Sequence, residues 1–129
     1  MSKQLDVAIL GAGVSGLCMG IQLIEAGIES FAIFEKSQDV GGTWLDNSYP
    51  GSGCDVPSHL YSFSFEPNPE WSRAFSPQPE IQRYLRHCAE KYGLLPKIRF
   101  GTEIAGARFD EHAGLWHIRT STGEEITAK

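Results

Sequence analysis

Residues 7–20 read VAILGAGVSGLCMG, an apolar run that passes through three glycines into a second apolar segment. The glycines follow the spacing G-x-G-x-x-G. In such a turn the first glycine permits a tight bend, the second lets the backbone approach a pyrophosphate, and the third lets the helix pack closely on the sheet. The free N–H groups and partial positive charge of a helix N-terminus also favour a phosphate. The turn is therefore predicted to bind a cofactor through Gly11, Gly13, Val14, Ser15 and Gly16.

The segments on either side of the turn predict one strand–helix–strand unit over residues 1–36. A β-branched apolar run at residues 5–10 is typical of a buried parallel strand, and the apolar spacing over residues 14–26 is that of a helix ended by Gly27. A second buried strand is predicted at residues 31–34, with a right-handed crossover between the strands. The glycine pattern alone is weakly specific, but in this setting it predicts a dinucleotide site.

Glu35 is the predicted ribose ligand, because it ends the second strand 19 positions after Gly16. Its carboxylate would accept hydrogen bonds from the ribose hydroxyls of the adenosine half. The same carboxylate would repel a 2′-phosphate, so NADP is disfavoured at this site. A solvated carboxylate at a strand end is the alternative. Lys36, beside it, either covers the adenine side or is an ordinary surface residue.

Composition argues against several classes of function. The chain has 129 residues, 41% of them hydrophobic and 21% charged, with a formal net charge of −5. A nucleic-acid partner requires a surplus of Lys and Arg, so none is expected. No apolar run approaches the ~20 residues that span a bilayer, and the first strand leaves no room for a signal peptide, so we expect a cytoplasmic protein without membrane contact. The three cysteines form no C-x-x-C pair and the histidines show no metal spacing, so neither a disulfide framework nor a metal site is expected.

A long loop and a helix follow the first unit. Residues 37–77 are rich in Gly, Pro and Ser but also hold many aromatic residues, which favours a functional loop over disorder. A helix is predicted over residues 78–93, with Ser76 as its N-cap and Pro77 at its first position. Four residues at the i, i+3, i+4, i+7 spacing of one helix face are predicted to be buried, namely Ile81, Tyr84, Leu85 and Cys88. Arg83 and Arg86 lie off this apolar face and are expected to be solvated.

The last segment, residues 97–129, predicts short strands. They are expected at residues 98–100, 104–109, 116–120 and from Glu125 onward, with the last three joined as a β-meander. The fold class is therefore α/β: a Rossmann-like FAD/NAD(P)-binding domain with a parallel sheet, a strand–helix–strand start, a crossover helix and a C-terminal β-meander. Because the chain stops in or just after a strand, we expect residues 1–129 to be the truncated N-terminal part of such a domain.

A second glycine pair, Gly41–Gly42, follows Glu35 after five intervening residues. It indicates a second close approach of the backbone to the cofactor, which a dinucleotide longer than NAD requires. The arrangement E-x5-G-G after G-x-G-x-x-G resembles the FAD site of flavoproteins with two dinucleotide-binding domains. A glycine turn without a ligand is the alternative.

Residues 41–65, GGTWLDNSYPGSGCDVPSHLYSFSF, indicate a more specific family among these flavoproteins. This block resembles the corresponding stretch of Baeyer–Villiger monooxygenases and related flavin-containing monooxygenases, with the pattern G-G-x-W, Y-P-G-x-x-C-D and S-x-x-Y-x-(F/Y)-S-F. Residues 76–85, SPQPEIQRYL, also resemble the start of the next helix in this family. The family commonly has arginines where this chain has Ser48 and Gly53. The resemblance covers essentially the whole chain.

The resemblance implies roles for individual residues. Gly42, Thr43 and Trp44 would lie along the ribityl chain and the flavin edge. Asp55 would lie near the flavin and the nicotinamide, with a catalytic role, although an aspartate before Val-Pro also suits a turn-capping residue. Tyr61 would line the flavin pocket, although Trp44 and Tyr61 also fit as aromatic residues of the loop core. The main chain of Ile104 would pair with adenine.

For the parent protein the resemblance implies FAD, NADPH bound by a second domain, and O2 with a small organic substrate. The reaction would transfer oxygen to a ketone or to a nitrogen or sulfur atom through a C4a-peroxyflavin. Two alternatives remain: another FAD oxidoreductase, or a non-catalytic fragment that does not retain flavin. A disulfide reductase would need a C-x-x-x-x-C pair, which is absent, and an amine oxidase lacks the Tyr-Pro-Gly block. Without a second domain, we expect the chain alone to be inactive, and its sheet edges could produce a homodimer or strand-exchanged oligomer.

Overall fold

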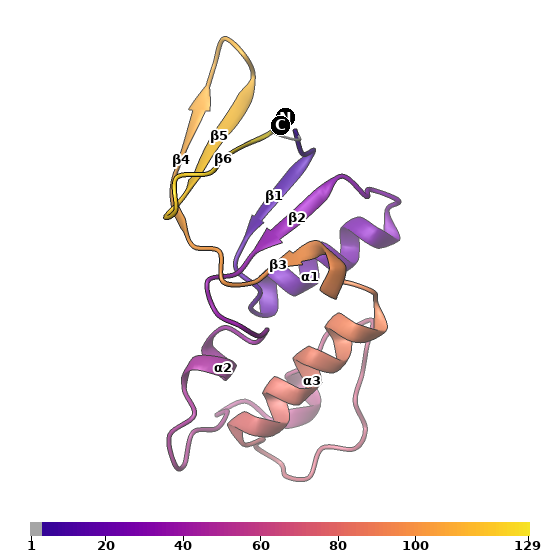
Figure 1. Cartoon of the computed structure of the whole chain (residues 1–129). Coiled ribbons are helices and arrows are strands. Elements are labelled where there is room, and N and C mark those ends of the chain that lie inside the picture. Colours follow the sequence, from indigo (N-terminus) through magenta and orange to yellow (C-terminus); the bar gives the residue numbers. More distant parts are fainter. Residues whose placement is uncertain (1–3) are drawn as a thin grey trace.

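The computed structural model describes residues 4–129, which form two small sheets, three helices and a long loop (Figure 1). The elements in chain order are β1 (Val7–Leu10), α1 (Val14–Glu25), β2 (Phe31–Phe34), α2 (Thr43–Asp46), the 3₁₀ turn η1 (Ser58–Leu60), α3 (Gln78–Lys91), the 3₁₀ turn η2 (Leu95–Lys97), β3 (Ile98–Arg99), β4 (Ile104–Asp110), β5 (Leu115–Thr120) and β6 (Glu125–Ala128). The order confirms the predicted α/β class.

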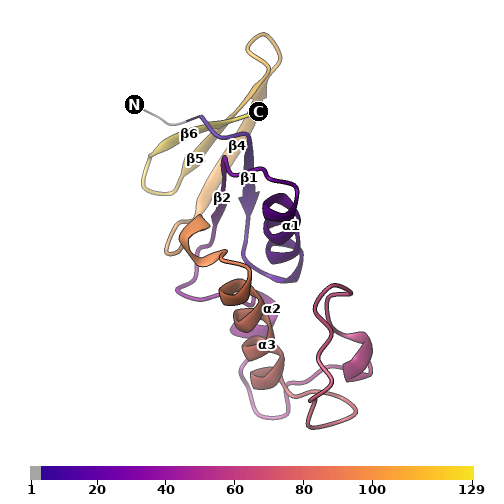
Figure 2. The ribbon, with the colours of Figure 1, turned by 90° about the vertical axis from the view of Figure 1, so that its right-hand side faces the viewer.

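The first sheet is parallel, with the strand order β1-β2-β3. β1 and β2 run in register from Val7 opposite Phe31 to Leu10 opposite Phe34. Helix α1 makes the crossover between them and lies against the sheet (Figures 1 and 2). It ends at the predicted glycine, since Gly27 has a φ of +76°. The strand–helix–strand unit is thus confirmed.

The main core lies between this sheet, α1, α3 and the long loop. The predicted apolar face of α3 is buried at all four positions, Ile81, Tyr84, Leu85 and Cys88. The predicted N-cap is wrong: Pro77 occupies that position and the helix begins at Gln78. The Ser76 hydroxyl instead pairs with the Ser58 hydroxyl at 2.5 Å, and both side chains are buried. A pairing between residues 18 positions apart leaves no local pattern in the sequence.

The second sheet is the predicted antiparallel meander, with the strand order β4-β5-β6. One face of it packs on the parallel sheet through a small cluster made of Phe34, Ile118, Ile126 and Ala128. Its last strand also pairs in parallel with Leu5, just before β1. The meander therefore covers the face of the parallel sheet opposite α1 (Figure 2).

β1 has one open edge. The amides of Val7 and Gly11 donate to the carbonyls of Ser30 and Phe34 on the β2 side. Because alternate residues of a strand point their backbone groups in opposite directions, those of Ala8 and Leu10 face the open edge. The Leu10 side chain is 57% exposed. The self-association expected from such edges stays a prediction.

No helix in residues 4–129 is both long and apolar enough to cross a membrane. In the same part of the chain, no three His, Cys, Asp or Glu side chains gather as a metal site would require. All three cysteines are free thiols.

Candidate functional site

A groove of about 310 Å³ lies where β1 and β2 end. Both strands point toward this edge (Figure 1), which is where open α/β sheets bind their ligands. The groove gathers six of the predicted cofactor residues from four segments of the chain, namely Gly11, Gly13, Glu35, Lys36, Gly42 and Ile104.

The turn after β1 has the geometry that its glycines predict. Gly11 has a φ of +95°, and its amide donates to the Phe34 carbonyl at 2.8 Å. Gly13 is the N-cap of α1, and no side chain caps this end of the helix. A Cβ at Gly16 would lie only 1.9 Å from the Gly11 carbonyl oxygen. The third glycine is therefore required because α1 folds back over the carbonyl of the turn.

Glu35 connects the turn to the segment after β2. Its side chain is only 6% exposed, so the alternative of a solvated carboxylate is wrong. One carboxylate oxygen accepts the Ala12 amide at 2.7 Å, and the other accepts the Ser37 amide at 2.9 Å. An ionised carboxylate has about four acceptor positions, so capacity remains for hydroxyl donors from a ligand.

The second glycine pair packs directly on the first turn. The Gly41 amide donates to the Ala12 carbonyl at 3.0 Å. Gly42 has a φ of +53° and a ψ of −119°, and a Cβ there would lie 3.1 Å from the Gly13 Cα. The two glycine turns are thus in backbone-to-backbone contact, which is a structural reason for the pair in addition to the approach of a ligand.

The predicted aromatic residues lie beside a second cavity. The Trp44 indole N–H donates to the Tyr61 hydroxyl at 3.0 Å, and the two rings meet edge to face at 5.7 Å. Tyr61 and Val14 line an apolar cavity of about 230 Å³, together with residues of the loop and of α3. Six of the predicted site residues therefore line the groove, and two, Val14 and Tyr61, line this cavity.

Five predicted residues line neither space. Gly16 is buried and Trp44 is half-buried. Ser15 and Thr43 are exposed. Asp55 is also exposed, and its carboxylate makes no hydrogen bond or ion pair with any other residue in the range 4–129. Its side chain therefore does not cap the loop, and it stays available to a ligand.

Sequence reasoning missed part of the groove: its lining also includes Leu10, Phe34, Asp46, Thr102 and Glu103. The Thr102 amide donates to the Glu35 carbonyl at 2.9 Å, which holds the segment after β3 beside the segment after β2. The signal was available in principle, because the carboxyl ends of parallel strands share one edge. β3 has only two residues, however, and its role as a third parallel strand is not visible in the sequence.

The charge of the groove is mostly negative. Three carboxylates, Glu35, Asp46 and Glu103, line it beside one cation, Lys36. Such a lining disfavours an additional phosphate at the ribose end. A pyrophosphate would instead be placed at the N-terminus of α1, where the amides and the helix dipole favour negative charge.

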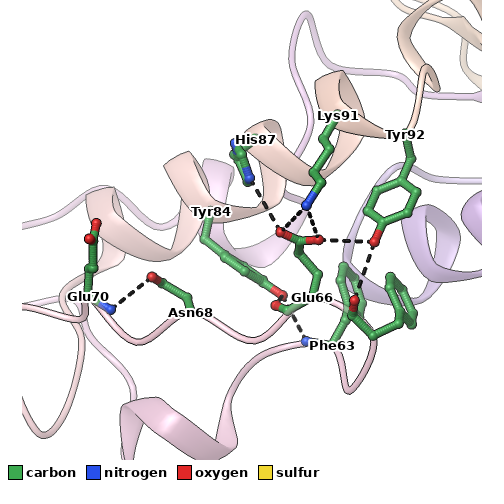
Figure 3. A network of polar contacts seen from close by, with 9 residues as sticks. Phe63, Glu66, Asn68, Glu70, Tyr84, His87, Lys91 and Tyr92 are labelled. Atoms are coloured by element: carbon green, nitrogen blue, oxygen red, sulfur yellow. Dashed lines mark hydrogen bonds and ion pairs between the residues drawn. The ribbon is translucent and has the colours of Figure 1, made fainter.

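The returning arm of the long loop is attached to α3 around Glu66 (Figure 3). The Lys91 ammonium donates to both carboxylate oxygens, at 2.7 and 2.9 Å, and the Tyr92 hydroxyl donates at 3.0 Å. The buried Tyr84 hydroxyl accepts the Phe63 amide and donates to the Glu66 carbonyl at 2.7 Å. Burial raises the pKa of Tyr84 above its usual range.

Acid should weaken this attachment. The hydrogen bond from Lys91 lowers the pKa of Glu66 below its usual range. A lowered folded-state pKa contributes stability that is present above the unfolded pKa, about 4.3 for glutamate, and is lost as pH falls through the folded value. We expect the thermal unfolding midpoint of wild type to fall more steeply between about pH 6 and pH 3 than that of Glu66→Gln. Parallel pH profiles of the two proteins, measured by circular dichroism, would contradict this.

Residues 9–87 match the family model described as NAD(P)-binding Rossmann-like domain. The chain belongs to this family. Over 127 residues this Rossmann-like domain is 52% identical to a Baeyer–Villiger monooxygenase of Pseudomonas aeruginosa, covering 98% of the chain and 24% of that protein. It is 50% identical to a Baeyer–Villiger monooxygenase of Streptomyces coelicolor over 94% of the chain and 23% of that protein.

Solved structures give the same picture. The Rossmann-like domain superposes on a steroid monooxygenase bound to NADP with a TM-score of 0.92 and 39% identity, over 98% of the chain and 25% of the other. It superposes on a closed crystal structure of cyclohexanone monooxygenase with a TM-score of 0.94 and 34% identity, over 100% and 25%. The resemblance to this group of monooxygenases is thus confirmed. The chain spans about a quarter of the length of the relatives it matches.

Proposed function

We propose that this chain is the FAD-binding portion of a flavin-dependent, NADPH-using monooxygenase. The observation that carries the proposal is the groove, where the glycine turn, the glycine pair and the buried Glu35 come together. The relatives named above are monooxygenases, and a further relative from Dothistroma septosporum, 42% identical over 120 residues, is named an FAD-binding monooxygenase.

The residues of the groove fit the adenosine diphosphate half of FAD. The uncapped N-terminus of α1 offers amides to the pyrophosphate, and Gly13 and Gly42 leave the backbone open to it. Glu35 would accept the ribose hydroxyls through its remaining acceptor positions. Ile104 and Lys36 also line the groove, and the main chain of Ile104 and the stem of Lys36 would lie against the adenine.

The remaining predicted residues would act at the flavin end. The hydrogen bond from Trp44 to Tyr61 fixes the two rings relative to each other, so they can support a flat, apolar ring system. The exposed carboxylate of Asp55 would orient the nicotinamide amide. When bound, FAD would supply the transfer of one oxygen atom from O2 to a ketone or to a nitrogen or sulfur atom, with NADPH as reductant.

Titration with adenine nucleotides tests the proposal. FAD added to the chain should give saturable quenching of flavin fluorescence, with weak affinity and no NADPH oxidation, because the chain spans a quarter of its relatives. ADP should compete with FAD, whereas adenosine 2′,5′-bisphosphate should not, since its 2′-phosphate would meet the Glu35 carboxylate. Absence of binding by both FAD and ADP, or equal competition by the two nucleotides, would contradict the proposal.

A further inference from the structure

One polar face of α3 is directed at the segment that carries the second glycine pair. Gln78, Gln82 and Arg86 recur every four residues, which places them on one side of the helix. We call these three residues the α3 stripe. Gln78 is buried and the other two are half-buried. The Arg86 side chain is 43% exposed, as expected for a residue off the apolar face, but it also pairs with Asp39 and Glu90, which the sequence did not predict. Arg83, next to Gln82 in the sequence, is exposed as expected.

Each member of the α3 stripe contacts residues 39–44. The Gln78 amide donates to the Trp44 carbonyl. The Gln82 amide donates to the Val40 carbonyl at 3.1 Å and to the Asp39 carboxylate at 3.2 Å. The Arg86 guanidinium donates to the other oxygen of Asp39. The segment is thus held at both ends, at Asp39–Val40 and at Trp44, by one helix.

Residues 39–44 also contact the glycine turn that follows β1. The Gly41 amide donates to the Ala12 carbonyl. A Cβ on Gly42 would lie only 3.1 Å from the Gly13 Cα. The φ angles of Gly41 and Gly42 are +130° and +53°. Glycines are the most freely rotating residues of a chain, so such a conformation persists only where neighbours hold it. The Gln82 Cγ would lie 3.2 Å from a Cβ at Gly41, so the stripe lies directly behind the pair.

We propose that Gln78, Gln82 and Arg86 are positioning residues, which fix Gly41–Gly42 against the glycine turn and thereby set the affinity of the groove for its dinucleotide. None of the three lines the groove itself. Their effect passes through Asp39, Val40 and Trp44 to the two glycines. The part that concerns the ligand rests on the proposed function, whereas the part that concerns the glycine pair does not.

The test compares Gln82→Ala and Arg86→Ala with the matched control Arg83→Ala on the same helix. Without ligand, the Gly41 amide should exchange with solvent roughly tenfold faster in the two stripe variants, while the Ile33 amide in β2 keeps its wild-type rate. The FAD dissociation constant should rise roughly tenfold in the same variants. Arg83→Ala should leave both quantities unchanged, and Arg86→Lys should restore most of the wild-type values, because an ammonium can still reach Asp39.

The outcomes separate this proposal from the proposed function. If wild type binds no FAD or ADP, the function proposal fails, while faster exchange confined to Gly41 still supports the positioning role. If FAD binds wild type and both stripe variants equally and Gly41 exchange is unchanged, the positioning role fails and the function stands. Equal acceleration of Gly41 and Ile33 would mean general loss of stability, which would also overturn the positioning role.

Discussion

Replacing Gly16 by alanine should abolish FAD binding and leave the strand–helix–strand unit severely destabilised. The new Cβ would lie 1.9 Å from the Gly11 carbonyl oxygen, and that neighbour is backbone, which cannot rotate away. The helix would have to move off the turn, which separates the amides of its N-terminus from the groove. Overpacking typically costs about 1–3 kcal/mol and occasionally more, and a clash with backbone, which cannot move aside, is expected at the upper end. Urea unfolding and fluorescence titration with FAD measure the two effects.

Gly27→Ala is the matched control for this change. Gly27 ends the same helix with a φ of +76°, but a Cβ there would meet open space. The substitution should therefore cost only the strain of a left-handed alanine, about 1–2 kcal/mol, and FAD affinity should be retained. If Gly16→Ala proved as stable as Gly27→Ala and bound FAD like wild type, the packing of the turn described here would be wrong.

The second large effect is expected at Glu35. In Glu35→Gln, one carboxylate oxygen becomes an amide nitrogen, which cannot accept a hydrogen bond. Either the Ala12 or the Ser37 amide then loses its partner beside a side chain that is 6% exposed. We expect a loss of about 1–3 kcal/mol in the free energy of unfolding and a roughly 10- to 100-fold weaker binding of ADP.

Specificity offers a further readout for the same variant. Removal of the negative charge should narrow the difference in affinity between ADP and adenosine 2′,5′-bisphosphate, because the repulsion of the 2′-phosphate is lost. Glu29→Gln, at an exposed position just before β2, is the control and should change neither stability nor binding. An unchanged ADP affinity in Glu35→Gln would show that the carboxylate does not contact the ribose.

Much of the fold could be predicted because its signals are local. The apolar run that gives β2 was expected at residues 31–34, where it lies, and the spacing of Ile81, Tyr84, Leu85 and Cys88 gave the buried face of α3. The turn signals at residues 111–114 and 122–123 likewise indicate the meander. Each of these features depends on neighbours within a few positions, so a single sequence contains it.

The errors concern contacts between distant segments. Ser76 is predicted as a helix cap but pairs with Ser58, and nothing in the sequence predicts the pairing of Arg86 with Asp39. The glycine pair was expected to approach a ligand, while its packing on Gly13 depends on how two turns meet in space. Thr102 and Glu103 enter the groove only because β3 joins the parallel sheet. Periodicity carries no information about such pairings.

We propose that the adenosine diphosphate half of the cofactor lies across the α1 N-terminus, with Glu35 at the ribose. Amide chemical-shift perturbation of the ¹⁵N-labelled chain by ADP tests it most directly. The largest shifts should cluster at residues 11–16, Ser37, Gly42 and Thr102 and should saturate together. Shifts confined to the meander or to the cavity beside Tyr61, or no shifts at millimolar ADP, would contradict it.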